Sequence, residues 1–185
     1  MVQNRNIDLE VLLVLVRGAS HLREIARVLN ESHSTVFRRI KELVRETVLD
    51  FRWEGRNKVF FIKNNLRAKN CVFSAEIYRL SRLLGKYPEL AIILEDIKKA
   101  VPKGMIVLFG SYAKGNARAD SDIDIYVETD SPDIKARLKT LHSRLSIKTG
   151  VFDKDSLLIR EIIRNHIIVR GVEDYYEKIG FFKET

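Results

Sequence analysis

The stretch from Met105 to Glu128, MIVLFGSYAKGNARADSDIDIYVE, constrains the fold of this 185-residue chain more than any other. It opens on a short apolar run, Met105–Phe109, which is typical of a fully buried strand. The Gly110-Ser111 pair closes that run, and we expect a short helix or turn to begin at Ser111. After a polar segment, residues 122–127 alternate between polar and apolar side chains, which predicts a second strand. The stretch therefore predicts two strands of one α/β domain.

Asp122 and Asp124 are two residues apart on the second predicted strand, so their carboxylates are expected to share one face. Neighbouring carboxylates repel each other unless a cation lies between them. Mg²⁺ prefers one or two carboxylates together with water and phosphate oxygens, and such an ion neutralises a triphosphate. We therefore predict that Asp122 and Asp124 bind Mg²⁺ (or Mn²⁺).

The Gly110-Ser111 pair supplies the complementary half of such a site. Glycine lets a phosphate approach the backbone, serine offers a hydroxyl, and the backbone N–H groups of the following turn favour an anion. Lys114 lies just beyond and carries a charge that suits a phosphate. We predict that Gly110, Ser111 and Lys114 bind the phosphates of a nucleotide.

A Gly-Ser pair, ten residues, and then Asp-x-Asp resembles the motif of the polymerase-β-like nucleotidyltransferase superfamily, and most closely that of its minimal members. The resemblance covers about residues 88–180. It implies transfer of a nucleoside monophosphate from a nucleoside triphosphate to an acceptor, with Asp122 and Asp124 as the catalytic metal ligands and the Gly-Ser turn on the triphosphate. A protein side chain, an RNA end and a small molecule all remain open as the acceptor.

Active members of that superfamily usually carry a third carboxylate on a later strand. The corresponding strand here is expected at Leu145–Phe152, which has no acid and places Lys148 in its middle. Asp153 follows directly but is expected to cap a helix over Lys154–Arg164, with Asp155 as the alternative cap. Asp120 and Glu128 are further substitutes, although Glu128 lies too far along its strand. An active enzyme and a domain that binds nucleotide without transferring it both remain open.

The first 65 residues predict a winged helix-turn-helix. Apolar residues recur at helical spacing in three blocks, with Ser20 and Ser32 as expected caps of the second and third helices. Two β-like runs, 48–53 and 58–63, are joined by a Gly- and Asn-containing turn. The third helix has one apolar face and one basic, hydroxyl-bearing face, as a helix that enters a DNA major groove requires. The predicted contacts to double-stranded DNA are Ser34, Thr35, Arg38 and Arg39 on that helix and Arg56 and Lys58 on the hairpin.

Charge supports this prediction weakly, because residues 1–65 hold 12 Lys and Arg against 8 Asp and Glu within a chain of net charge +8. Basic faces are often simply solvated, and winged helices also mediate protein contacts, so a DNA-binding regulator with a nucleotide-sensing or protein-interacting second domain is the alternative function. On the hairpin, Trp53, Phe60 and Phe61 are expected in the core rather than in a base-stacking surface.

The domains are predicted at 1–65 for the winged helix-turn-helix, 66–87 for an inter-domain helix and 88–185 for the nucleotidyltransferase domain with a mixed sheet. The junction is expected near Asn64–Asn70. The apolar stripe Val72–Leu84 suits either an inter-domain helix or a dimerisation helix, so a homodimer is open. A single cysteine, Cys71, and the lack of a long apolar segment predict a cytoplasmic protein without membrane contact.

Overall fold

The computed structural model describes residues 5–183, which divide into two compact units. The first unit takes in the chain up to Tyr78 together with Phe182 onwards, and the second runs from Arg79 to Phe181. The division falls inside helix α4 (Leu66–Lys86), which is later in the chain than the junction predicted near Asn64–Asn70.

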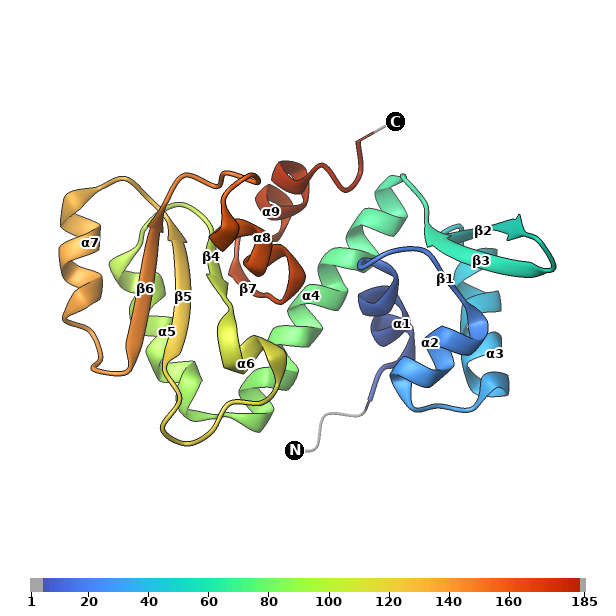
Figure 1. Cartoon of the computed structure of the whole chain (residues 1–185), viewed down its shortest axis with the longest axis horizontal. Helices are drawn as coiled ribbons and strands as arrows, with labels where there is room; N and C mark the ends of the chain where they lie inside the picture. The colour runs from blue at the N-terminus through green and yellow to red at the C-terminus, as the bar shows by residue number, and fades with distance from the viewer. Residues whose placement is uncertain (1–4, 184–185) are drawn as a thin grey trace. The chain divides into compact units, whose positions relative to one another are not determined.

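The first unit is a winged helix-turn-helix, as the sequence predicts. Its elements run α1 (Ile7–Leu15), β1 (Ser20–His21), α2 (Leu22–Leu29), α3 (His33–Arg45), β2 (Leu49–Glu54) and β3 (Asn57–Ile62). The three strands form an antiparallel sheet in the order β1-β3-β2, and β2 and β3 make the hairpin wing (Figure 1). Gly55 and Arg56 form its turn, with Gly55 at a φ of 61°.

The turn between α2 and α3 follows from two polar residues. Asn30 adopts a left-handed conformation, φ 51°, and ends α2. Ser32 then caps α3, because its side chain accepts a hydrogen bond from the N–H of Thr35 at 3.1 Å. The cap predicted at Ser20 is wrong: Ser20 and His21 instead pair with Phe60 and Val59 of β3, so strand pairing satisfies the backbone there.

The core of this unit joins its three helices to the sheet. Its buried residues include Val11 and Leu12 of α1, Ile25 of α2, Val36 and Ile40 of α3, and Phe60 of β3. The first half of α4 adds Ala68 and Ala75. Burial of these residues is the main force that holds α3 and the wing in place.

The second unit is a four-stranded mixed sheet with helices, again as predicted. After α5 (Glu89–Ala100) come β4 (Ile106–Leu108), α6 (Gly110–Lys114), β5 (Ile123–Glu128), α7 (Pro132–Lys139), β6 (Leu145–Gly150), α8 (Leu157–Arg164), β7 (Ile167–Arg170) and α9 (Val172–Ile179). The strand order is β6-β5-β4-β7, in which β5 and β6 are parallel and the other neighbours antiparallel.

Apolar layers cover the sheet and fix the strand that carries the predicted acids. Ile123 and Ile125 of β5 pack in one core with Leu90 and Leu94 of α5 and Leu138 of α7. From the alternate position on β5, Tyr126 contacts the ring of Phe152, which in turn packs against Tyr175 of α9. Asp124 shares the strand parity of Tyr126, so its side chain is excluded from the core of Ile123 and Ile125.

The helix predicted at Lys154–Arg164 begins later than expected. It starts at Leu157, and Ser156 is its cap, accepting the N–H of Ile159 at 3.2 Å. Asp153 does not cap it, since its carboxylate accepts the N–H of Asp155 in a local turn instead. None of the helices in the described part of the chain combines the length and apolar character that a membrane span requires.

Candidate functional site

Gly110 and Asp124 lie against each other, and glycine is the residue that permits it. Gly110 has a φ of 67° and opens α6 directly after β4. A Cβ at this position would lie 2.9 Å from Cγ of Asp124 and closer still to its Oδ2. The neighbouring backbone is fixed too, because the N–H of Phe109 donates to the carbonyl of Asp124 at 2.9 Å. The fold therefore brings the predicted Gly-Ser turn and Asp124 together.

The two predicted metal ligands differ in burial. Asp124 lies within β5 and is half-buried, whereas Asp122 directly precedes the strand and is exposed. Within residues 5–183, neither carboxylate has a hydrogen bond or an ion pair with another side chain, so no basic neighbour neutralises them. Two hard carboxylate oxygens without protein partners fit Mg²⁺, which needs only one or two of them alongside phosphate and water.

The neighbouring strand offers no third acid. In the parallel register Asp124 pairs with Ser146, and Tyr126 pairs with Lys148. Asp120 is exposed in the loop before β5, and Glu128 forms an ion pair with Lys178 at 2.9 Å. No three His, Cys, Asp or Glu side chains are grouped to hold a metal ion within the described residues. Asp122, two positions before Asp124 in the chain, is thus the remaining predicted ligand.

Lys114, the predicted phosphate contact, has a partner that the sequence did not suggest. Its ammonium lies 3.0 Å from the carboxylate of Glu161 on α8, and both side chains are about half exposed. The two residues are 47 positions apart, and no local pattern connects them. This ion pair connects the end of α6 to α8. An exposed pair of this kind contributes little to stability.

The segment that follows α6 is anchored from several sides. Lys86 donates to the carbonyl of Gly115 at 3.0 Å. The buried ring of Tyr112 packs edge-on against Tyr87, and its hydroxyl accepts a hydrogen bond from Arg144 at 2.5 Å. These contacts hold Tyr112, the residue after Ser111, and Gly115 at the end of α6.

On the first unit, α3 presents one continuous exposed face. Ser34, Phe37, Arg38 and Lys41 are exposed and lie three, four and seven positions apart, which places them on one side of the helix. Thr35 is half-buried and accepts a hydrogen bond from the hydroxyl of Ser32 at 2.8 Å. Of the predicted contacts on α3, Ser34 and Arg38 are therefore the most accessible.

Arg39, another predicted DNA contact, is engaged within the protein. Its guanidinium makes a two-point ion pair with Asp8 of α1, one bond of which is 2.5 Å. The hydrogen bonds that Arg39 donates to the Asp8 carboxylate raise the pKa of Arg39, and its charge is directed at α1. Arg38 and Arg39 thus point to different surroundings although they are adjacent in sequence.

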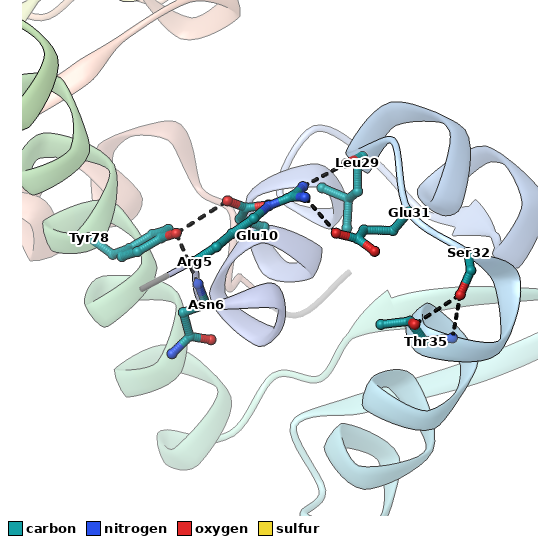
Figure 2. A network of polar contacts seen from close by, with 8 residues as sticks. All are labelled: Arg5, Asn6, Glu10, Leu29, Glu31, Ser32, Thr35 and Tyr78. Atoms are coloured by element: carbon teal, nitrogen blue, oxygen red, sulfur yellow. Dashed lines mark hydrogen bonds and ion pairs between the residues drawn. The ribbon is translucent and has the colours of Figure 1, made fainter. Parts of the chain in front are cut away.

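A network of hydrogen bonds and ion pairs supports the turn that precedes α3 (Figure 2). Arg5 donates to Glu10 of α1 at 2.7 Å and, on its other side, to Glu31 at 2.5 Å and to the carbonyl of Leu29 at 2.6 Å. Tyr78 of α4 accepts the N–H of Asn6 at 3.1 Å and donates to Glu10. Helices α1, α2 and α4 together therefore fix where α3 begins.

The wing carries the remaining predicted contacts and one correction. Arg56 is exposed in the turn, while the ammonium of Lys58 lies 3.9 Å from the ring centre of Phe51 and 5.2 Å from that of Trp53. Phe60 is buried as predicted, but Trp53 is 63% exposed rather than in the core. Trp53 pairs with Lys58 near the turn, and its ring is covered only in part, by Phe51 and by the ammonium of Lys58.

Fold and site together define a protein of two modules, a winged helix-turn-helix and a mixed-sheet domain in which Asp124 lies beside a Gly-Ser turn. Residues 90–179 match the family model described as a nucleotidyltransferase domain. The second module of this chain is therefore a nucleotidyltransferase domain of the polymerase-β-like superfamily. Enzymes of this superfamily typically use divalent metal ions.

Several solved structures are similar to part of this chain. The adhesin competence repressor of Streptococcus pyogenes is 24% identical, covers 48% of this chain and 73% of its own, and has a TM-score of 0.37. ZitR of Lactococcus lactis is 20% identical. The match covers 48% of this chain and 61% of ZitR, with a TM-score of 0.38.

A homodimeric winged helix-turn-helix domain from Mycobacterium bovis, a possible ArsR-family regulator, is 19% identical over 45% of this chain and 70% of its own, with a TM-score of 0.32. Scores this low carry no argument about function, and the winged-helix assignment rests on element order and strand register. A comparison with curated proteins found no match.

Proposed function

We propose that this chain is a Mg²⁺-dependent nucleotidyltransferase, tethered to a DNA-binding module, that moves a nucleoside monophosphate from a nucleoside triphosphate to an acceptor. Asp122 and Asp124 would hold the ion, which on binding supplies charge neutralisation of the triphosphate. Gly110 and Ser111 would hold the phosphates, and Lys114 would add a positive charge. The contact of Asp124 with Gly110 is the observation that carries this proposal, since it sets metal ligand and phosphate turn side by side.

The proposed reaction is an in-line substitution at phosphorus. A hydroxyl oxygen of the acceptor attacks the α-phosphorus, and a new P–O bond forms. The bond from the α-phosphorus to the oxygen that bridges it to the β-phosphate breaks, pyrophosphate leaves with that electron pair, and the hydroxyl proton passes to water. The residues of this chain act by positioning the triphosphate and by balancing its charge, which are the main sources of rate in phosphoryl transfer.

Transfer is tested directly with nucleoside triphosphates labelled at the α-phosphate. The protein is incubated with each labelled nucleotide, Mg²⁺ and, in turn, protein, RNA and small-molecule acceptors. Label in an acceptor together with released pyrophosphate supports the enzyme. Four nucleotides compared in parallel identify the base, and omission of Mg²⁺ is expected to abolish the signal.

The absence of a third acid beside Asp124 favours one alternative, a regulator whose second domain senses a nucleotide without transferring it. Ser146 and Lys148 occupy the strand positions that face Asp124 and Tyr126. Such a domain would bind the magnesium nucleotide in a calorimeter but release no pyrophosphate over hours. Duplex binding that changes when the nucleotide is added would complete the case for the sensor.

For the first unit we propose binding to double-stranded DNA through α3 and the wing. The exposed Arg38 and Arg56 suit phosphate contacts. Arg5 supports the turn before α3 through its bonds to Glu31 and to the carbonyl of Leu29. Ser34, Thr35 and Lys58 are supporting contacts. This proposal needs no contribution from Arg39, whose charge is engaged by Asp8.

Substitution of Arg38 and Arg56 by alanine is expected to weaken duplex binding and to flatten its salt dependence. Each lost phosphate contact should lower the slope of log affinity against log salt by about 0.9. The measurement is fluorescence anisotropy of a labelled duplex at several salt concentrations. Slopes that match the wild type would remove both residues from the interface.

Arg39→Ala is the matched control, because it removes an adjacent arginine that pairs with Asp8. We expect it to lower the free energy of unfolding by up to about 1 kcal/mol, as for a partly exposed two-point ion pair, and to leave the salt slope unchanged. Chemical denaturation measures the first effect and anisotropy the second. A slope that falls as much as in Arg38→Ala would show that Arg39 leaves Asp8 for DNA.

A further inference from the structure

The aromatic side chains of this chain are almost all buried or half-buried, with two exceptions. Among the described residues, Phe37 is 51% exposed and Trp53 is 63% exposed, while every other Phe and Tyr ring is at least half covered. Both exceptions belong to the first unit, and they lie on α3 and on the wing, the elements proposed to face DNA. Exposed apolar side chains also occur elsewhere, among them Leu66 and Leu157, but within the described residues the exposed aromatic rings lie on these two elements.

Phe37 lies in the centre of the exposed face of α3. Ser34 lies one turn before it, Arg38 beside it and Lys41 one turn after it. A ring surrounded by a hydroxyl and two cations does not suit an apolar protein partner, which would have to bury both charges. It suits duplex DNA, where the cations meet phosphates and the ring meets the only apolar group in the major groove, the 5-methyl of thymine.

The neighbours of Trp53 on the wing hold its ring in one orientation. Its ring packs edge-on against Phe51 at 6.3 Å between centres, and the ammonium of Lys58 lies over both rings. An ordered aromatic ring loses little conformational entropy when it binds. Arg56 in the adjacent turn and Lys58 itself provide the positive charge that a nucleic-acid backbone attracts.

We propose that Phe37 and Trp53 form the apolar part of a duplex DNA interface, in which Phe37 determines specificity by contacting thymine 5-methyl groups and Trp53 anchors the wing on the sugar-phosphate edge. This inference rests on the proposed DNA-binding function and adds the base that is recognised. The arginines supply binding that depends on salt, and the two rings supply binding that does not.

The test begins with duplexes enriched from a random library by the full-length protein at moderate salt. The enriched sites are then prepared with each thymine replaced in turn by uracil, which removes only the 5-methyl group. We expect one or two positions at which uracil weakens wild-type binding by about fourfold, the effect of one buried methyl. At those positions Phe37→Ala should bind the thymine and uracil duplexes equally.

Trp53→Ala is expected to weaken binding to all enriched duplexes by roughly tenfold while keeping the thymine preference and the salt slope. Leu66→Ala, which removes an exposed apolar side chain from α4 in the same unit, is the control and should change nothing. Circular dichroism and thermal unfolding confirm that each variant is folded, as expected for exposed positions.

Several outcomes would overturn the inference while leaving the DNA-binding proposal intact. Phe37→Ala that weakens thymine and uracil duplexes to the same extent would exclude methyl recognition. Wild-type protein that is dimeric by sedimentation, and monomeric in both aromatic variants, would assign the rings to contact between two copies. A preference for single strands would assign them to base stacking. If the wild type shows no salt-dependent duplex binding at all, the proposed DNA-binding function itself fails.

Discussion

Asp124→Asn is expected to lower nucleotidyl transfer by about 10³-fold, because an amide oxygen replaces a charged ligand where a metal ion must balance a triphosphate. Asp122→Asn should have an effect of similar size, and the double variant should be inactive. The substitution keeps the shape of the side chain beside Gly110, so folding should be unchanged. The measurement is release of pyrophosphate from nucleotide labelled at the γ-phosphate, at saturating concentration, with a Mg²⁺ titration of each variant.

Asp120→Asn serves as the matched control, since Asp120 is an exposed acid in the same loop. It should transfer at the wild-type rate, which separates loss of a ligand from loss of local negative charge. Retention of full activity by Asp124→Asn would contradict the assignment of the site. A wild type that binds the magnesium nucleotide and loses this binding in Asp124→Asn, yet never releases pyrophosphate, would favour the sensor.

Gly110→Ala is expected to lower transfer by roughly 10²-fold and to lower the free energy of unfolding by about 1–3 kcal/mol. Two costs combine at this position. A φ of 67° is unfavourable for any residue with a Cβ, and the added atom would collide with the carboxylate of Asp124. Relief of that collision displaces a proposed metal ligand, and a displacement of about 1 Å costs roughly 10²-fold in rate.

Gly115→Ala isolates the first of these costs. Gly115 ends α6 with a φ of 77°, but a Cβ there meets nothing within 4 Å. We expect a loss of about 1 kcal/mol in unfolding free energy and transfer within a few-fold of the wild type. Thermal unfolding and the pyrophosphate assay, run on both variants, make the comparison. Equal loss of activity in the two would show that backbone strain, and not contact with Asp124, limits the site.

The sequence was sufficient where the determining signals are local. The apolar run at Met105–Phe109, the alternation after Asp122 and the Gly-containing hairpin turn each specify an element within a few residues, and the structure has strands and turns at those places. The Gly-Ser and Asp-x-Asp motifs predicted that these two segments share one site, because the resemblance to a family connects segments that local patterns do not, and the structure has Gly110 against Asp124.

Features that depend on contacts between distant residues were not predictable. Nothing in the helical pattern shows that Arg39 meets Asp8, that Lys114 meets Glu161, or that Ser20 pairs with a strand 40 positions away. Trp53 was misassigned for a related reason. Strand alternation gives the face on which a ring lies, but whether that face is covered depends on how far the hairpin extends past the helices.

Helix α4 contributes residues to the cores of both units, which limits where the chain can be divided into two fragments. Ala68 and Ala75 belong to the core of the first unit and Leu83 to that of the second, and Phe182 from near the C-terminus lies 6.5 Å from Phe73 between ring centres. The two units are thus interleaved along the polypeptide, so cleavage after residue 65 would remove part of the core of the first unit.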